Sequence, residues 1–198
     1  MRNKFLRTLS SPAVQAEQVR YYGKSRVPPV SAQPQLLSLD EKTFIEARDS
    51  FYMATIGLEN WPYIQHRGGP KGFVQAISAT QLAFGDYNGN RQLISTGNVK
   101  ESQRMALFFM DYPARERLKV IGHARVLAPA EASDLLAQLI APKGTVIERV
   151  FQIDVLGFDW NCPKYITPRF TADEVEQATA PLRVRIAELE AVLSRTNA

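Results

Sequence analysis

The sequence predicts a mainly β protein with flanking helices, built on an antiparallel sheet or barrel. Apolar residues make up 45% of its 198 residues, which is enough for one large domain or two small ones with a substantial core. Most apolar or alternating runs are short and follow one another through tight turns, which favours antiparallel pairing over a parallel βαβ sheet. The strand candidates are residues 52–58, 62–67, 73–79, 81–85, 105–110, 118–127 and 151–155.

The chain divides into three predicted parts. Residues 1–38 read as an N-terminal arm, because prolines interrupt them and only residues 12–20 could form a short helix. Residues 39–170 form the folded domain, and residues 171–198 form a helical extension at the C-terminal end. We therefore expect one β domain with a segment outside it on each side.

Capping patterns and apolar spacing predict the helices. Ser38 is followed three residues later by Glu41, a capping box that predicts a helix start. Residues 130–141 read as a second helix with an apolar side, and Asn98 and Glu101 indicate another start. These helices are expected to flank the sheet.

The last helices follow a second capping box at residues 171–174. Pro181 suits the first turn of a new helix. Apolar residues then recur at spacings of four, three and four and form a seam: Leu182, Ile186, Leu189 and Leu193. The seam could pack on the domain itself or on a partner, and we expect packing on the domain.

Two strands carry the clearest patterns. Residues 118–127 alternate apolar side chains with Lys119, His123 and Arg125, as expected of a strand with one buried face. Residues 105–110 are apolar on both faces, as expected of a central strand.

The charge distribution argues against a nucleic-acid-binding protein. The formal net charge is +4, but residues 1–28 hold six basic and one acidic side chain, which leaves a charge of −1 on the remaining chain. A nucleic-acid-binding domain should carry its basic stripe on the folded body. We therefore expect no nucleic-acid partner.

Cysteine and histidine are too few for several classes of site. Cys162 is the only cysteine, which excludes an internal disulfide framework, and two histidines make a Cys/His zinc site improbable on composition. No run approaches a membrane span, and the first residues lack the apolar block of a signal peptide. We expect a cytoplasmic protein with no membrane partner and no bound metal.

Residues 86–98 form the most informative segment, a polar loop that leads into a helix start. Arg91 offers a forked cationic donor, Asn90 and Gln92 offer amides, and Ser95 and Thr96 offer hydroxyls. Such donors beside the free N–H groups of a helix suit a phosphate. The alternative is an ordinary hairpin, because the sequence Asn-Gly at residues 88–89 is a strong turn signal.

Two further segments could contact a planar ligand. Gln65, His66 and Arg67 end a strand before two glycines, which could admit a flat ligand or simply form a solvated turn. Farther along, an aromatic wall and an anion contact could come from Trp160 and Arg169. The chain has no glycine-rich dinucleotide fingerprint and no Walker loop.

Taken in order, four stretches resemble the pyridoxamine 5′-phosphate oxidase-related, FMN-binding split-barrel family: residues 51–55, 62–69, 89–92 and 106–111. The likeness covers residues 40–127 and extends through residues 159–163. It implies a six-stranded Greek-key split barrel. It also implies a homodimer that holds FMN in a cleft at its interface.

The resemblance also implies site residues. Asn90, Arg91 and Gln92, with Ser95 nearby, correspond to the family's phosphate site. Gln65, His66 and Arg67 match the strand that lines the flavin, while Trp160 and Arg169 correspond to residues that the partner chain supplies in the oxidase. A small-molecule redox reaction carried out by the flavin is then expected.

The sequence departs from the oxidase itself. The Ser-Arg-Lys phosphate motif is replaced by Asn90-Arg91-Gln92, and the closing Arg-Leu-x-Pro segment is missing. A substrate other than pyridoxamine 5′-phosphate is therefore expected. Two alternatives remain: a split barrel that binds haem or a deazaflavin, with His66 and His123 as the available iron ligands, or a flavin-binding module without catalysis.

Overall fold

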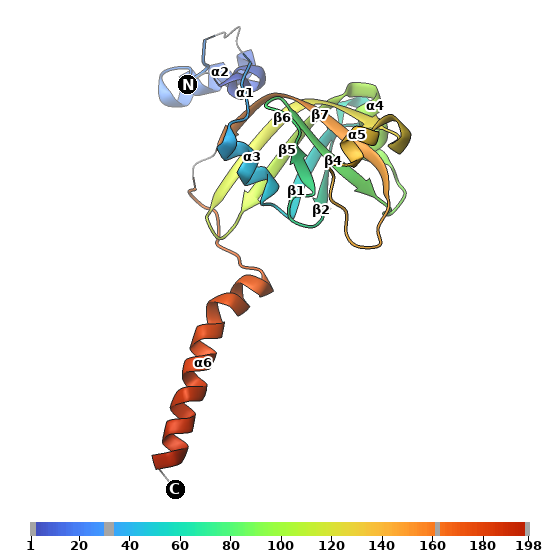
Figure 1. Ribbon diagram of the computed structural model, residues 1–198. Coiled ribbons are helices and arrows are strands. Elements are labelled where there is room, and N and C mark those ends of the chain that lie inside the picture. Colours follow the sequence, from blue (N-terminus) through green and yellow to red (C-terminus); the bar gives the residue numbers. More distant parts are fainter. Residues whose placement is uncertain (1–2, 30–33, 161–162, 197–198) are drawn as a thin grey trace.

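The computed structural model describes residues 3–29, 34–160 and 163–196, and its strands form one antiparallel sheet that curls into a split barrel (Figure 1). The strand order is β2-β1-β5-β6-β7-β4-β3. The predicted fold class is confirmed. The sheet has seven strands rather than six, because the short β3 (Val74–Ala76) adds to one edge by pairing with β4.

Every strand candidate lies on a strand of this sheet. The other strands are β1 (Ser50–Ile56), β2 (Pro62–Gly68), β4 (Gln81–Tyr87), β5 (Arg104–Asp111), β6 (Glu116–Leu127) and β7 (Ile147–Trp160). β7 is much longer than the run that predicted it, because it pairs with β4 near its beginning and with β6 along most of its length. Only the edge strand β3 is shorter than expected, since it has a neighbour on one side.

Aromatic side chains fill the barrel. The Phe51 ring lies 5.2 to 5.6 Å from the rings of Phe73, Phe84 and Phe109, measured between centroids, and each of these residues is at most 1% exposed. Small barrels of this kind have interiors just wide enough for side chains. A ligand of nucleotide size must therefore bind on the outside of the barrel.

The helices differ more from expectation than the strands do. They are α1 (Lys4–Leu9), α2 (Pro12–Tyr22), α3 (Leu39–Glu46), α4 (Ile94–Ser102), α5 (Ser133–Leu136) and α6 (Ala172–Thr196), with 3-10 turns at Leu58–Asn60 and Pro129–Glu131. The helix predicted over residues 130–141 is only a 3-10 turn and the four residues of α5. Pro181 does not begin a new helix but lies inside α6.

Part of the N-terminal arm is anchored on the barrel. Phe5 of α1 is 5% exposed and lies against Gly157 of β7. A Cβ atom at Gly157 would lie 2.7 Å from the backbone nitrogen of Phe5, so only glycine admits α1 this closely. The prediction that only residues 12–20 are helical was wrong, because α1 precedes α2.

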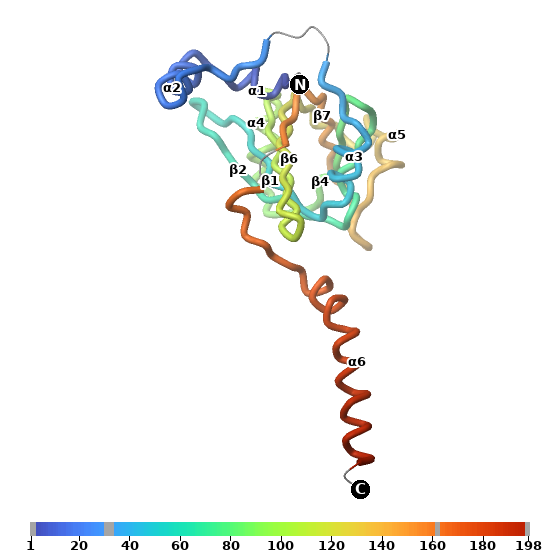
Figure 2. The backbone as a smooth tube through the Cα atoms, turned by 90° about the vertical axis from the view of Figure 1, so that its left-hand side faces the viewer, coloured from blue at the N-terminus to red at the C-terminus, as the bar shows by residue number. Residues whose placement is uncertain are grey.

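The C-terminal helix α6 extends away from the barrel, at the opposite end from α1 and α2 (Figures 1 and 2). None of its side chains is buried. The expectation that its seam packs on the domain was therefore wrong. Over the described residues, no helix is long and apolar enough to cross a membrane.

The capping box at Ser38 is present and gives a pH-dependent prediction. The Glu41 carboxylate accepts hydrogen bonds from the Ser38 N–H, at 2.9 Å, and from Trp160 Nε1, at 2.7 Å. Burial raises the pKa of Glu41, but these hydrogen bonds outweigh it and hold the pKa below its ordinary value. A carboxyl whose pKa falls on folding stabilises the protein above its unfolded pKa, and this contribution disappears on acidification.

We therefore expect Glu41→Gln to lower the free energy of unfolding by about 1 kcal/mol at neutral pH. The variant should lose less further stability than the wild type when the pH falls from about 7 to about 3, because it has no carboxylate to protonate. Urea denaturation at each pH measures both effects. Equal acid sensitivity in the two proteins would contradict this role of Glu41.

Candidate functional site

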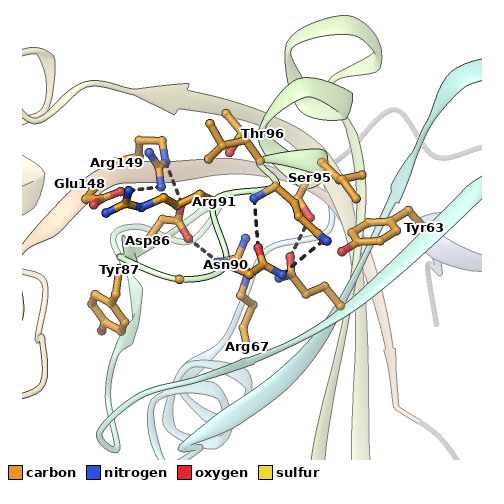
Figure 3. Close-up of a pocket in the computed structure, with 15 residues that line it drawn as sticks. Tyr63, Arg67, Asp86, Tyr87, Asn90, Arg91, Ser95, Thr96, Glu148 and Arg149 are labelled. Carbon is orange, nitrogen blue, oxygen red and sulfur yellow. Dashed lines mark hydrogen bonds and ion pairs between the residues drawn. The ribbon is translucent and has the colours of Figure 1, made fainter.

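A polar cleft of about 320 Å³ opens on the outside of the barrel, where β2, the loop between β4 and α4, and the start of β7 meet (Figure 3). It brings together six of the residues predicted to bind the cofactor: Gln65, Arg67, Asn90, Arg91, Gln92 and Ser95. The rest of its lining is Tyr63, Asp86, Tyr87, Gly89, Leu93, Ile94, Thr96, Glu148 and Arg149. This cleft is the candidate functional site.

The edge strand β2 supplies one wall of the cleft. Its side chains alternate between two faces, so Gln65 and Arg67 face the cleft while His66 lies exposed on the other face. His66 instead packs edge-on against Tyr52, with 5.6 Å between ring centroids. Within the described chain His66 is therefore not part of the cleft, although the sequence grouped it with Gln65 and Arg67.

The loop between β4 and α4 supplies the opposite wall. β4 is followed by a helix and not by a strand, so the hairpin alternative for residues 88–89 was wrong. The helix begins at Ile94, four residues earlier than Asn98 suggested. Asn98 lies inside the helix and donates a hydrogen bond of 3.0 Å to the buried Thr55.

The backbone of this loop can bind a hydrogen-bond acceptor through its N–H groups. Arg91 and Leu93 have φ angles of 61° and 54°, a left-handed conformation that is strained for residues other than glycine. Leu93 is the N-cap of α4 and offers no side-chain acceptor to the N–H groups of the first turn. Alternation between left- and right-handed residues creates concave anion-binding backbone, so this loop can receive a negatively charged group.

The floor of the cleft is an ion cluster that the sequence analysis missed. Asp86 is only 4% exposed and pairs with Arg67 and with Arg149, whose Nε lies 2.7 Å from Asp86 Oδ2. Arg149 also pairs with Glu148 at 2.9 Å. Burial lowers the pKa of Arg149, but the hydrogen bonds and charges of Asp86 and Glu148 outweigh it, so the net pKa is raised and the guanidinium remains charged.

The cluster leaves the cleft with spare hydrogen-bond donors. Arg67, Arg91 and Arg149 against Asp86 and Glu148 give the lining a formal charge of +1. Arg67 Nε is buried and has no hydrogen-bond partner among the described residues. An unpaired buried donor is costly, so an acceptor bound beside Arg67 would stabilise this site; Arg117 Nε, outside the cleft, is unpaired in the same way among the described residues.

Hydroxyl and amide groups complete the walls. The Ser95 hydroxyl donates to Gln65 Oε1 at 3.0 Å, which joins α4 to β2 across the cleft. Asn90 Oδ1 accepts the Gln92 N–H at 3.1 Å and stabilises the loop. These contacts position the polar groups from both sides of the cleft.

Trp160 and Arg169 lie away from the cleft in this chain. Trp160 packs edge-on against Phe44, with 4.7 Å between centroids, and donates to Glu41. Arg169 lies over the Tyr112 ring at 5.1 Å. Both residues were expected to contact the cofactor bound by a partner subunit, so their role stays a prediction. Cys162 lies outside the described residues.

Comparison with known proteins assigns residues 40–154 to a family model described as pyridoxamine 5′-phosphate oxidase. A candidate pyridoxamine 5′-phosphate oxidase from Lactobacillus delbrueckii superposes with a TM-score of 0.50 at 16% identity, covering 65% of this chain and 97% of that one. This superposition supports the fold. None of the curated proteins matches the sequence.

Two further structures resemble it more weakly. An FMN-binding protein from Syntrophomonas wolfei gives a TM-score of 0.48 at 10% identity, covering 61% of this chain and 83% of that one. A protein from Clostridium acetobutylicum related to general stress protein 26, of the pyridoxinephosphate oxidase family, gives 0.45 at 12% identity, covering 69% and 95%.

Proposed function

Because the chain belongs to the pyridoxamine 5′-phosphate oxidase family, we propose that it binds FMN, with the phosphate in the polar cleft. The observation that carries this proposal is the combination of an uncapped helix start, the exposed Arg91 and the unpaired donor of Arg67 around one cavity. An anion would satisfy all three groups at once. Binding of haem or of a deazaflavin in place of FMN is the alternative that the titration described below would detect.

Arg91 would hold the phosphate through its guanidinium. Asn90 and Gln92 would add hydrogen bonds from the same loop and Ser95 from the first turn of α4, while Arg67 would donate from the floor of the cleft. Arg67 and Arg149 add guanidinium groups to the cleft, but Asp86 and Glu148 already balance their charge. The phosphate would therefore meet one unpaired cation and a network of neutral donors.

We propose that the protein is a small-molecule oxidoreductase. FMN, when bound, supplies the redox chemistry, and the protein supplies binding and orientation. The amide of Gln65 lies on the strand expected beside the flavin, and donors there stabilise the negative charge that accumulates on reduction. Reduction of the FMN-loaded protein by NADH or NADPH, followed by reoxidation with an added acceptor, separates this function from non-catalytic flavin binding.

The working unit is proposed to be a homodimer with the cofactor at its interface. The outer face of β2, β1, β5 and β6 carries an apolar hollow of about 550 Å³. Ile64, on the other side of β2 from Gln65, is 67% exposed within this hollow. An exposed apolar surface of this kind is typical of a protein–protein interface.

We expect Ile64→Lys to raise the dissociation constant of this dimer at least about tenfold, because it places a charge in an apolar interface. Sedimentation velocity at several protein concentrations measures the change. An unchanged dissociation constant would contradict the use of this face.

A titration tests the cofactor. Full-length protein is mixed with FMN, and the flavin absorption and fluorescence are followed; we expect saturable binding in the micromolar range or tighter, at about −8 kcal/mol or below. Haemin and a deazaflavin are titrated in parallel. No flavin binding, or a Soret band together with weaker flavin binding, would overturn the proposal.

A further inference from the structure

The helix α6 exposes a long apolar stripe that no described residue covers. It spans 25 residues, and the apolar side chains of the stripe are between 46% and 63% exposed: Val175, Leu182, Ile186, Leu189 and Leu193. Helices in proteins gain most of their stability from packing such a stripe. Both views show α6 directed away from the barrel, so its own domain does not cover the stripe (Figures 1 and 2).

The stripe has the period of a coiled coil. Apolar and threonine residues recur at alternating spacings of four and three over three heptads: Val175, Thr179, Leu182, Ile186, Leu189, Leu193 and Thr196. A period of 3.5 residues keeps one seam against a partner helix as the two supercoil. A helix that packed on a globular domain would need a wider apolar face than this.

The residue types within the seam select the arrangement of the partner. In the middle of the seam, Leu182 and Leu189 occupy d positions and the β-branched Ile186 occupies the a position between them, while Thr179 and Leu193 fill the outer a positions. β-branched residues at a with leucine at d favour two parallel helices. The Thr179 hydroxyl donates to the Val175 carbonyl at 2.8 Å, so this polar group is already satisfied within the seam.

The flanking charges fit the same arrangement. Arg185 occupies a g position, and Glu190 occupies the e position of the next heptad. In a parallel pair these positions face each other across the two helices, which would create two symmetric ion pairs. Arg185 pairs with Glu188 of its own helix at 2.8 Å, but both side chains are more than half exposed, so exchanging that partner costs little.

We propose that α6 binds α6 of a second copy of this chain as a parallel, two-stranded coiled coil. Pro181 occupies a c position outside the seam, but it removes one backbone hydrogen bond of the helix, so residues 182–196 after it form the continuous part of the seam. The helix would tether two barrels and raise their effective concentration for each other. This proposal does not depend on any cofactor or on which face the barrels use.

Cysteine cross-linking of the full-length chain tests the proposal. In a Cys162→Ser background, Leu189→Cys places one thiol in the seam, where two parallel helices bring identical d positions together. Mild oxidation is expected to convert most of this variant into a disulfide-linked dimer. Non-reducing electrophoresis measures the dimer fraction, and circular dichroism checks that each variant is folded.

Val184→Cys is the matched control. Val184 is 61% exposed on the same helix, but it occupies an f position on the side opposite the seam, so it should cross-link at least tenfold less. Equal cross-linking of the two variants, or none in either, would overturn the proposal. A disulfide that forms only in a mixture of the Ile186→Cys and Leu189→Cys chains would indicate antiparallel helices, in which a positions meet d positions, and would also overturn it.

Discussion

Replacing Asp86 with asparagine is expected to lower the free energy of unfolding by about 3 kcal/mol. Asp86 is 4% exposed and is the shared acceptor of Arg67 and Arg149, which come from β2 and β7. The asparagine keeps the shape of the side chain but removes the charge, so two largely buried guanidinium groups lose their counter-ion. Arg149 retains Glu148, and this keeps the loss below the largest values seen for buried pairs.

Urea denaturation of wild-type and variant protein measures this loss. The matched control is Asp154→Asn, because Asp154 also lies on a strand and pairs with an arginine, Arg125, at 3.5 Å. Both partners are at least half exposed there, so the control should lose less than about 1 kcal/mol. Equal losses at the two positions would show that burial of the cluster does not determine its contribution.

The strands of the sheet could be predicted because each one shows its own pattern of apolar residues in the sequence. Alternation along residues 118–127 and the apolar run at residues 105–110 reflect the side-chain period of a strand, and both runs became neighbouring strands. The ends of elements were less predictable, because pairing decides them. The full length of β7 depends on β4 and β6, which lie far from it in sequence.

The walls of the cleft could likewise be predicted from local sequence, whereas its floor depends on strand pairing. Arg91 and its neighbours form one contiguous loop, so sequence could identify them. Asp86 and Arg149 meet only because they are opposed in the register of β4 and β7. No local pattern pairs two residues 63 positions apart. Strand period alone, however, could have separated His66 from Gln65 and Arg67.

Arg91→Ala is expected to weaken FMN binding by about 10- to 100-fold, equivalent to about 1.5–3 kcal/mol for a hydrogen bond to a charged group. Arg91 is exposed at the mouth of the cleft and is not part of the ion cluster with Asp86, so its loss should leave the fold intact. Fluorescence titration with FMN measures the change. Riboflavin, which lacks the phosphate, should bind the variant and the wild type equally.

The comparison of FMN with riboflavin separates a phosphate contact from a general disturbance of the loop. Arg115→Ala supplies the matched control, because Arg115 is an exposed loop arginine with a φ angle of 56°, close to the 61° of Arg91. Alanine therefore meets the same backbone strain at both positions, while Arg115 does not line the cleft. If Arg91→Ala weakens riboflavin as much as FMN, the arginine orders the loop and does not bind the phosphate. If neither ligand is affected, the phosphate site lies elsewhere. Removing a guanidinium that contacts the phosphate would remove a charge-assisted hydrogen bond and weaken FMN binding.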